Sequence, residues 1–238
     1  MHVKVALLTR QVLTALVVGV LLLTIAGTAV QVGKYVFDYR EGWTRFFNLD
    51  REYNNLPSLF SALLLLGNGI LLRSRGERAK VQGEGLAGSW RLLGTVFMVL
   101  AADEFLGLHE ILIIPDLAKW LGLPGFLRPL WGIPGAIAVL WGIWKFGPFW
   151  QQLPTKLKRR SLVAGIIYIT GALGMEMVGG AYADLEGQQN LVYALLTVVE
   201  EVLEMGGMIL LLRALLLDLK SWSGTFSFEA AIGTPPEA

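Results

Sequence analysis

The chain has 238 residues, of which 54% are hydrophobic and 16% are charged, and its 28 glycines raise the non-polar share further. Its 20 Lys and Arg residues and 19 Asp and Glu residues leave a formal charge of +1. These values exclude a disordered chain, a nucleic-acid binder held by bulk positive charge and an ordinary soluble enzyme. The absence of cysteine excludes disulfide scaffolds, thiolate metal sites and cysteine nucleophiles. A multi-pass membrane protein remains.

Six apolar segments are long enough to be membrane-spanning helices, since a span needs about 20 mostly apolar residues. In chain order these segments are 11–31, 57–72, 92–114, 131–149, 161–181 and 191–212. The sequence therefore predicts an all-α polytopic membrane protein with six transmembrane helices. We expect residues 1–220 to form a single domain and residues 221–238 to form a short cytoplasmic tail.

The distribution of basic residues predicts the orientation of these segments. If the N-terminus is cytoplasmic, six of the 20 Lys and Arg residues lie on the outer side, namely Lys34, Arg40, Arg45, Arg51, Lys119 and Arg128. The other 14 then lie on the inner side. This excess follows the positive-inside rule, and it predicts cytoplasmic N- and C-termini in the cell inner (plasma-type) membrane.

Carboxylate side chains within the predicted spans are the most informative feature of the sequence. Seven of the 19 acidic residues lie there, namely Asp103, Glu104, Glu110, Glu176, Glu200, Glu201 and Glu204. An acidic residue at the centre of a membrane helix costs about 2.5–3.5 kcal/mol on the insertion scale. No Lys or Arg lies deep in any span, because Lys145 falls in the last turn of its segment. The carboxylates therefore indicate a function rather than chance.

Helical geometry places these carboxylates on shared faces. Asp103 and Glu110 are seven residues apart, which puts them within about 20° of each other on an ideal helix. Glu200 and Glu204 are about 40° apart, and Glu201 lies about 60° beyond Glu204. Each of the two helices is thus predicted to present one acidic face.

The depth of the acidic residues agrees with a common site. Glu110 and Glu176 lie near the outer ends of their segments, whereas the other five lie nearer the midplane at about 1.5 Å per residue. We therefore expect one acidic cavity, open to the outside, among the segments 92–114, 161–181 and 191–212.

Three functions are compatible with such a cavity, because buried carboxylates must be protonated or compensated by a bound cation. The preferred hypothesis is cation or proton translocation, with the lipid bilayer and a small cation or proton as partners. The predicted cation-binding or proton-relay residues are Asp103, Glu104, Glu176, Glu200, Glu201 and Glu204. The alternatives are a membrane-embedded metal-dependent enzyme, which would hold a divalent metal ion, and a structural or assembly subunit.

The sequence does not decide the roles of three further polar residues. His109 is the only histidine within a span, and it is either a metal ligand, a proton shuttle or an interfacial side chain. His109 and Glu110 are the additional metal ligands that the enzyme hypothesis would use. Asn68 either faces the cavity or makes a hydrogen bond between helices.

The common catalytic motifs are missing from the chain. A di-iron site of the ferritin type needs Glu-x-x-His on two helices, but Leu106 stands three residues before His109 and no second span contains a histidine. No Gly-x-Ser-x-Gly, P-loop or dinucleotide fingerprint is present. The sequence thus predicts where the functional site lies, but it does not identify the substrate.

Overall fold

The computed structural model describes residues 2–6, 9–48, 55–112, 114–223 and 227–231. Its α-helices are α1 (Thr9–Val36), α2 (Leu56–Val81), α3 (Ala87–Leu106), α4 (Pro115–Trp120), α5 (Gly132–Gln152), α6 (Thr155–Ile169), α7 (Glu176–Glu186) and α8 (Leu191–Ser223). Short 3-10 helices are η1 (Gly42–Phe47), η2 (His109–Leu112) and η3 (Gly125–Leu127), and η4 (Thr170–Met175) is a π-helical turn. The strands are β1 (His2–Ala6) and β2 (Ser227–Ala231).

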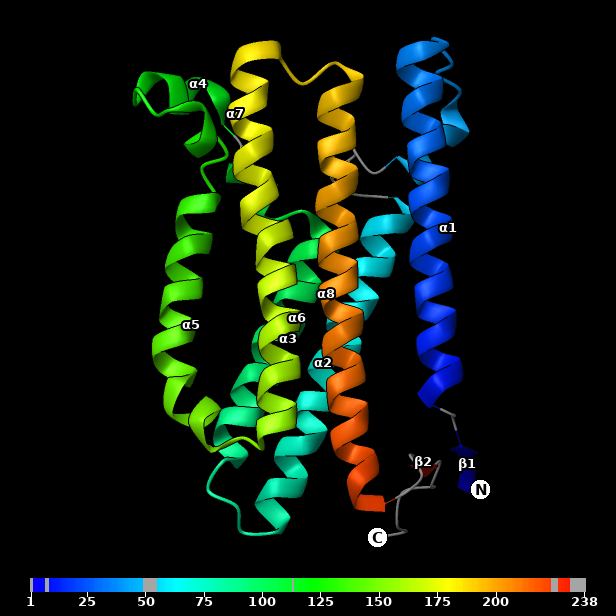
Figure 1. Ribbon diagram of the computed structural model, residues 1–238, viewed down its shortest axis with the longest axis vertical. Helices are drawn as coiled ribbons and strands as arrows, with labels where there is room; N and C mark the ends of the chain where they lie inside the picture. The colour runs from blue at the N-terminus through cyan, green and yellow to red at the C-terminus, as the bar shows by residue number, and fades with distance from the viewer. Residues whose placement is uncertain (1, 7–8, 49–54, 113, 224–226, 232–238) are drawn as a thin grey trace, which may run out of the picture.

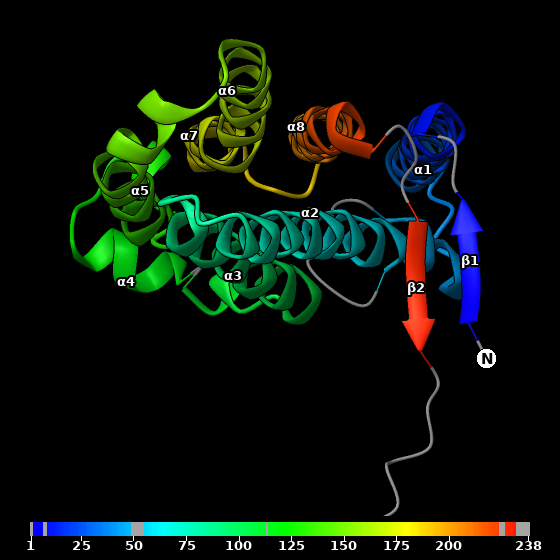
Figure 2. The same ribbon diagram turned by 90° about the horizontal axis from the view of Figure 1, so that it is seen from below.

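The long helices form a bundle with their axes roughly side by side (Figure 1). Helices α2 and α3 pack together as a hairpin, and α8 packs against α1, α2 and α6. The view along the bundle places α8 between α1 and α6 (Figure 2). Helix α5 lies at the edge, where it packs mainly against η4. The acidic helix α8 is therefore central to the molecule.

Within the part of the chain that the structure describes, three continuous helical segments are long and apolar enough to cross a membrane, namely Thr9–Val36, Leu56–Val81 and Thr155–Glu186. The last of these joins α6, η4 and α7. They correspond to the predicted segments 11–31, 57–72 and 161–181. Their length and composition indicate association with a membrane.

The predicted end of the third segment, 92–114, is wrong. We expected a helix over 92–114, but α3 ends at Leu106 because Gly107 has a left-handed backbone with φ of 62°. The Gly107 N–H donates to the backbone oxygen of Asp103, which closes the last turn. Glycine adopts this conformation without the penalty that a Cβ atom would bring.

The bundle is all-helical, as the sequence predicts, and the two ends of the described chain add a small antiparallel sheet. Strand β1 pairs with β2, and His2 lies opposite Ala231. This pairing brings both strands to the same end of the bundle (Figure 1). Part of the expected tail 221–238 is therefore paired, and residues 224–226 and 232–238 lie outside the described residues.

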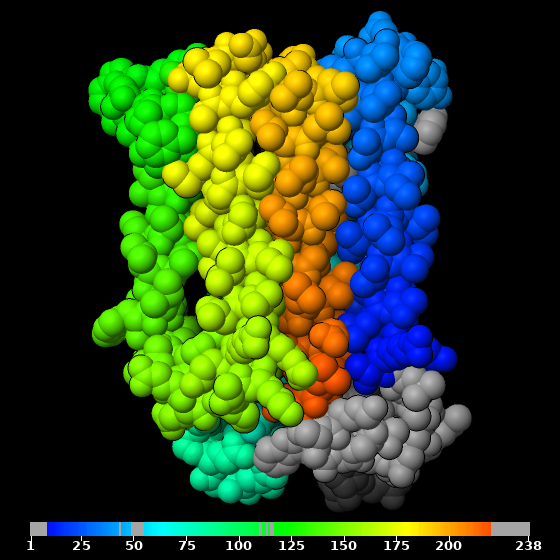
Figure 3. Space-filling model, viewed as in Figure 1, coloured from blue at the N-terminus to red at the C-terminus, as the bar shows by residue number. Residues whose placement is uncertain are grey.

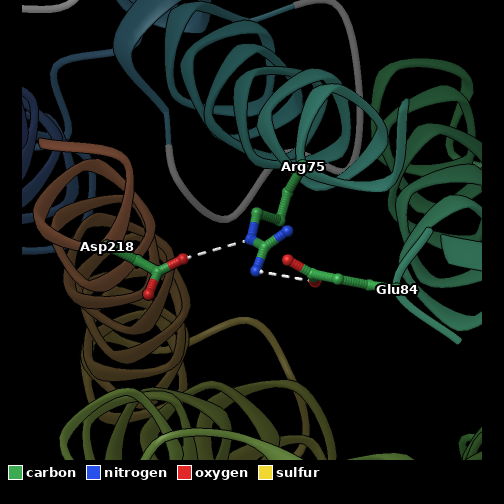
Figure 4. A network of polar contacts seen from close by, with 3 residues as sticks. All are labelled: Arg75, Glu84 and Asp218. Carbon is green, nitrogen blue, oxygen red and sulfur yellow. Dashed lines mark hydrogen bonds and ion pairs between the residues drawn. The ribbon is translucent and has the colours of Figure 1, made fainter. Parts of the chain in front are cut away.

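A buried ion-pair network ties α2 and α8 together at this same end (Figure 4). The Arg75 guanidinium contacts Asp218 at 3.3 Å and Glu84 at 3.2 Å, and it lies over the Trp90 ring. The side chain of Arg75 is only 9% exposed. Burial raises the pKa of the Asp218 carboxyl, and the guanidinium beside it opposes that rise. The network stands next to an apolar core of which Leu72, Trp90 and Leu215 are buried members.

Candidate functional site

A cavity of about 1030 Å³ runs between α3, α5, α6, α7 and α8. Its wall includes the six carboxylates that the sequence predicts as cation-binding or relay residues, together with the one histidine. These are Asp103, Glu104, His109, Glu176, Glu200, Glu201 and Glu204. The structure thus brings the predicted side chains to one site, and their role there stays a prediction.

Asp103 and His109 form a close pair at the end of α3. Asp103 Oδ2 lies 2.8 Å from His109 Nδ1, and Asp103 Oδ1 accepts a hydrogen bond from the His109 backbone N–H at 3.0 Å. The His109 ring packs against Trp131 with a centroid distance of 5.0 Å. The chain can make this turn because α3 ends at Gly107. A carboxylate fixed on a ring nitrogen sets which nitrogen of the histidine carries the proton.

Glu104 connects this pair to the carboxylates of α8. It lies beside the fully buried Ser61 of α2 and interacts electrostatically with His109 and Asp103. From the other side, Glu204 of α8 interacts with Glu104 and Glu201. The titratable groups of α3 and α8 therefore form one electrostatically connected set.

Glu204 is the most deeply buried carboxylate of the set. Only 9% of the residue is exposed, and its side chain makes no hydrogen bond or ion pair with the part of the chain that the structure describes. It nevertheless lines the cavity. A carboxyl group held in this way needs a proton or a cation from the cavity, because an ionised and unpaired carboxylate in a low dielectric is very costly.

Glu176 of α7 and Glu200 of α8 both line the cavity and interact electrostatically across the contact of the two helices. Two carboxyl groups that lie close together in a low dielectric cannot both stay ionised unless a cation compensates them. Glu176 directly follows the π-helical turn η4, and π-helical turns occur frequently at functional sites. Gly171 of η4 allows the close approach, because a Cβ atom there would stand 2.9 Å from Glu200 O and 2.9 Å from Glu204 Cγ.

Glu110 does not lie on α3 as expected, and Asn68 takes the interhelical one of its two expected roles. Glu110 does not share a helical face with Asp103, because α3 ends between them and Glu110 lies in η2. The Glu110 side chain is outside the described part of the chain. Asn68 is fully buried, and its Nδ2 donates to Leu64 O at 2.9 Å and to Met208 O at 3.0 Å. Asn68 therefore joins α2 to α8 by a hydrogen bond.

The sequence analysis missed several groups that surround the carboxylates. Tyr168 of α6 lines the cavity and interacts with Glu204 and Glu104. Arg128 lines the wall near η3 and forms an ion pair with Asp184 of α7. Helix α5 also contributes to the wall. Tyrosines and apolar helices are common in membrane proteins, where they serve ordinary packing. The sequence therefore does not indicate that these positions line a cavity.

The described residues do not form a group of three or more His, Asp or Glu side chains with the arrangement of a metal site.

The fold and the cavity define a helical bundle protein that associates with a membrane and holds buried carboxylates. The chain belongs to the family described as a domain of unknown function (DUF8692), whose model matches residues 12–219. The matched region begins in α1 and ends in α8, so it contains every residue of the cavity described above. No curated protein and no solved structure matches the chain.

Proposed function

We propose that this protein is a multi-pass inner-membrane protein that translocates protons or small cations through its buried carboxylates. Six helices would cross the membrane, with both termini in the cytoplasm. The acidic residues of α3, α7 and α8 would bind or relay the translocated species.

One observation carries the proposal, namely that Glu176 and Glu200 line the cavity beside the buried Glu204, whose side chain makes no hydrogen bond or ion pair with the described residues. Neighbouring buried carboxyl groups can hold a proton or a cation between them, and the bound species can move from one group to the next at little cost. A purely structural network would instead give every buried polar group a fixed partner.

The proposed topology rests on charge and on the position of the chain ends. With the N-terminus inside, 14 of the 20 Lys and Arg residues lie on the cytoplasmic side. The pairing of β1 with β2 at one end of the bundle supports an even number of crossings.

The relay would begin at the end of the bundle opposite the termini. There the Asp103–His109 pair lines the cavity, and Glu104 couples it to Glu204. His109 is suited to the outer position, because imidazole changes its charge near physiological pH. Each step in this route passes between groups that already interact in the structure.

Flux into proteoliposomes tests this function. Wild-type protein is expected to move protons or a monovalent cation down an imposed gradient, as reported by a pH-sensitive dye or a cation-sensitive dye. Glu204→Gln and Glu200→Gln should reduce the rate to that of protein-free liposomes, because an amide cannot carry the charge or release the proton. The matched control is Glu77→Gln, since the Glu77 side chain is 57% exposed and does not line the cavity.

Other outcomes would contradict translocation and favour one of the alternatives. A stoichiometric transition metal that survives dialysis would favour a metal-dependent enzyme. Loss of thermal stability in Glu204→Gln, with no flux in any variant and no metal, would favour a structural or assembly subunit.

A further inference from the structure

The cavity has two chemically different halves. The half nearer Asp103 carries the carboxylates, the histidine and Tyr168, together with the basic side chains of Lys34, Lys119 and Arg128. The half nearer the termini is lined mainly by aliphatic and aromatic side chains, which include Leu72, Leu93, Phe97, Phe149, Leu153 and Leu215. An apolar lining of this kind does not assist the passage of a proton or a hydrated ion.

The apolar half is also larger than an ion pathway needs. Leu93 and Glu104 both line the wall from α3, and these positions are eleven residues apart, which corresponds to about 16 Å at about 1.5 Å per residue. The whole cavity of about 1030 Å³ is at the upper end of the volumes that hold drug-sized ligands. A water molecule takes about 30 Å³ in the liquid, so a cation with a few waters would fill only a small part of it.

The cavity has an opening toward the side of the bundle. Of the residues of α5, Phe149 alone is buried, and the helix packs chiefly against η4. The space-filling view shows gaps between α5 and α6 at mid-height (Figure 3). Gly165 of α6 and Ala138 of α5 both line the cavity, and a Cβ atom at Gly165 would meet no other atom within 4 Å. A molecule dissolved in the bilayer could enter by this route.

We propose that the cavity binds a long-chain amphiphile with a cationic ammonium headgroup, which enters between α5 and α6. The ammonium group would lie at Glu176, Glu200 and Glu204, and the alkyl chain would lie along the apolar half. This inference rests on the proposed function and gives its substrate class, a lipophilic amine in place of an inorganic cation.

Charge complementarity favours this ligand over a neutral or anionic one. An ammonium group has three donors and no acceptor, which matches a cluster of carboxylate oxygens. Glu204 is nine-tenths buried, lines the cavity and lacks a hydrogen-bond or ion-pair partner in the described structure. An alkyl chain that moves from water into the cavity gains about 0.8 kcal/mol per methylene group. An alkyl chain that moves from the lipid bilayer into the cavity gains little, because lipid is already apolar. The headgroup must therefore provide the selectivity for an amine over a neutral amphiphile.

Photo-crosslinking in proteoliposomes tests the proposal. The probe is a dodecylamine that carries a diazirine at mid-chain, and its controls are the corresponding dodecanol and a butylamine probe. We expect the amine to label peptides of the cavity wall in α3, α5 and α6. Glu204→Gln should lower this labelling by about ten-fold or more, because it removes one member of a buried charge pair. A phosphatidylethanolamine with a diazirine in its acyl chain tests whether the headgroup comes from a lipid or a free amine, and labelling by either source supports the proposal.

Two blocking variants and a matched control separate the cavity from the lipid-facing surface. Gly165→Phe and Ala138→Phe place a ring in the apolar half from opposite walls, so both should reduce labelling of α3. Gly142→Phe is the control, since Gly142 also has open space around it but does not line the cavity. Two blocking positions keep the test decisive if one of the variants fails to fold.

The outcomes distinguish this inference from the proposed function. Equal labelling by amine and alcohol, or labelling that neither blocking variant changes, would overturn the inference and leave flux of inorganic cations or protons unaffected. Labelling that requires the amine and Glu204, without flux of any ion, would support the binding site while the translocation proposal fails.

Discussion

Asp103 stabilises the end of α3 through two separate contacts with His109. One oxygen accepts the His109 backbone N–H, and the other lies 2.8 Å from the ring nitrogen. Asp103→Ala removes both contacts and should lower the free energy of unfolding by about 1–3 kcal/mol. Asp103→Asn should cost less, because its amide oxygen still accepts the backbone N–H.

Thermal unfolding in detergent and proton flux, measured on both variants, test this reading. If Asp103 takes part in the relay, Asp103→Asn should lose flux while most of its stability is retained. Equal flux in Asp103→Asn and wild type would show that the pair only closes the helix.

At the scale of elements, Gly171 and Gly174 lie in the same turn, η4, but differ in the space available for a side chain. A Cβ atom at Gly171 would stand 2.9 Å from Glu204 Cγ, so Gly171→Ala must push η4 away from α8. Such overpacking costs about 1–3 kcal/mol and should separate Glu176 from Glu200. A Cβ atom at Gly174 meets only Thr170 Cγ2 at 3.7 Å, so Gly174→Ala should be neutral or stabilising. The midpoint of thermal unfolding of the two variants provides the comparison.

The Arg75 network fixes the end of α2 to α8. Arg75→Met leaves Asp218 and Glu84 without their cation, and the Asp218 side chain is only 14% exposed. Breaking a buried pair costs about 3–5 kcal/mol, and the partial exposure of Glu84 places this loss near the lower figure. Arg40→Met is the control, because Arg40 and Asp38 form an exposed pair whose loss costs about 0–1 kcal/mol.

Chemical unfolding of both variants measures the difference. A double variant that combines Arg75→Met with Asp218→Asn should recover part of the stability, because the unpaired carboxylate is then gone. A loss in Arg75→Met no larger than that in Arg40→Met would contradict the structural importance of the network.

The sequence predicts the positions of helices better than it predicts where they end. Apolar length predicts the position of a helix, because the cost of exposed backbone in lipid requires it, and α1 and α2 follow that rule. The end of α3 depends on the backbone conformation of Gly107, which stands in an apolar run where a glycine is also compatible with a membrane helix. The prediction that Glu110 shares a helical face with Asp103 failed for this reason, and so did the expectation that His109 lies on the same continuous helix as Asp103.

For the whole molecule, the sequence predicts the acidic residues of the cavity because an acidic side chain in a membrane helix has a high free-energy cost. The remaining residues of the cavity wall are ordinary in a membrane helix, so the sequence does not indicate them. The role of α5 follows from its loose packing, which only the tertiary arrangement reveals. The same holds for Asn68, whose partner Met208 lies 140 residues away. The sheet of β1 and β2 joins the two ends of the chain, and no local pattern predicts such a pairing.

The topology of the whole molecule can be tested with single cysteines, because the chain contains none. Leu185 at the end of α7 is 83% exposed, and Val81 at the end of α2 is 87% exposed, so both positions tolerate the change and accept a reagent. With cytoplasmic termini, a membrane-impermeant maleimide should label Leu185→Cys in right-side-out vesicles and Val81→Cys only after permeabilisation. The reverse pattern would invert the orientation, and it would place the carboxylate half of the cavity toward the cytoplasm. Labelling of both positions in sealed vesicles would contradict membrane-spanning segments between them.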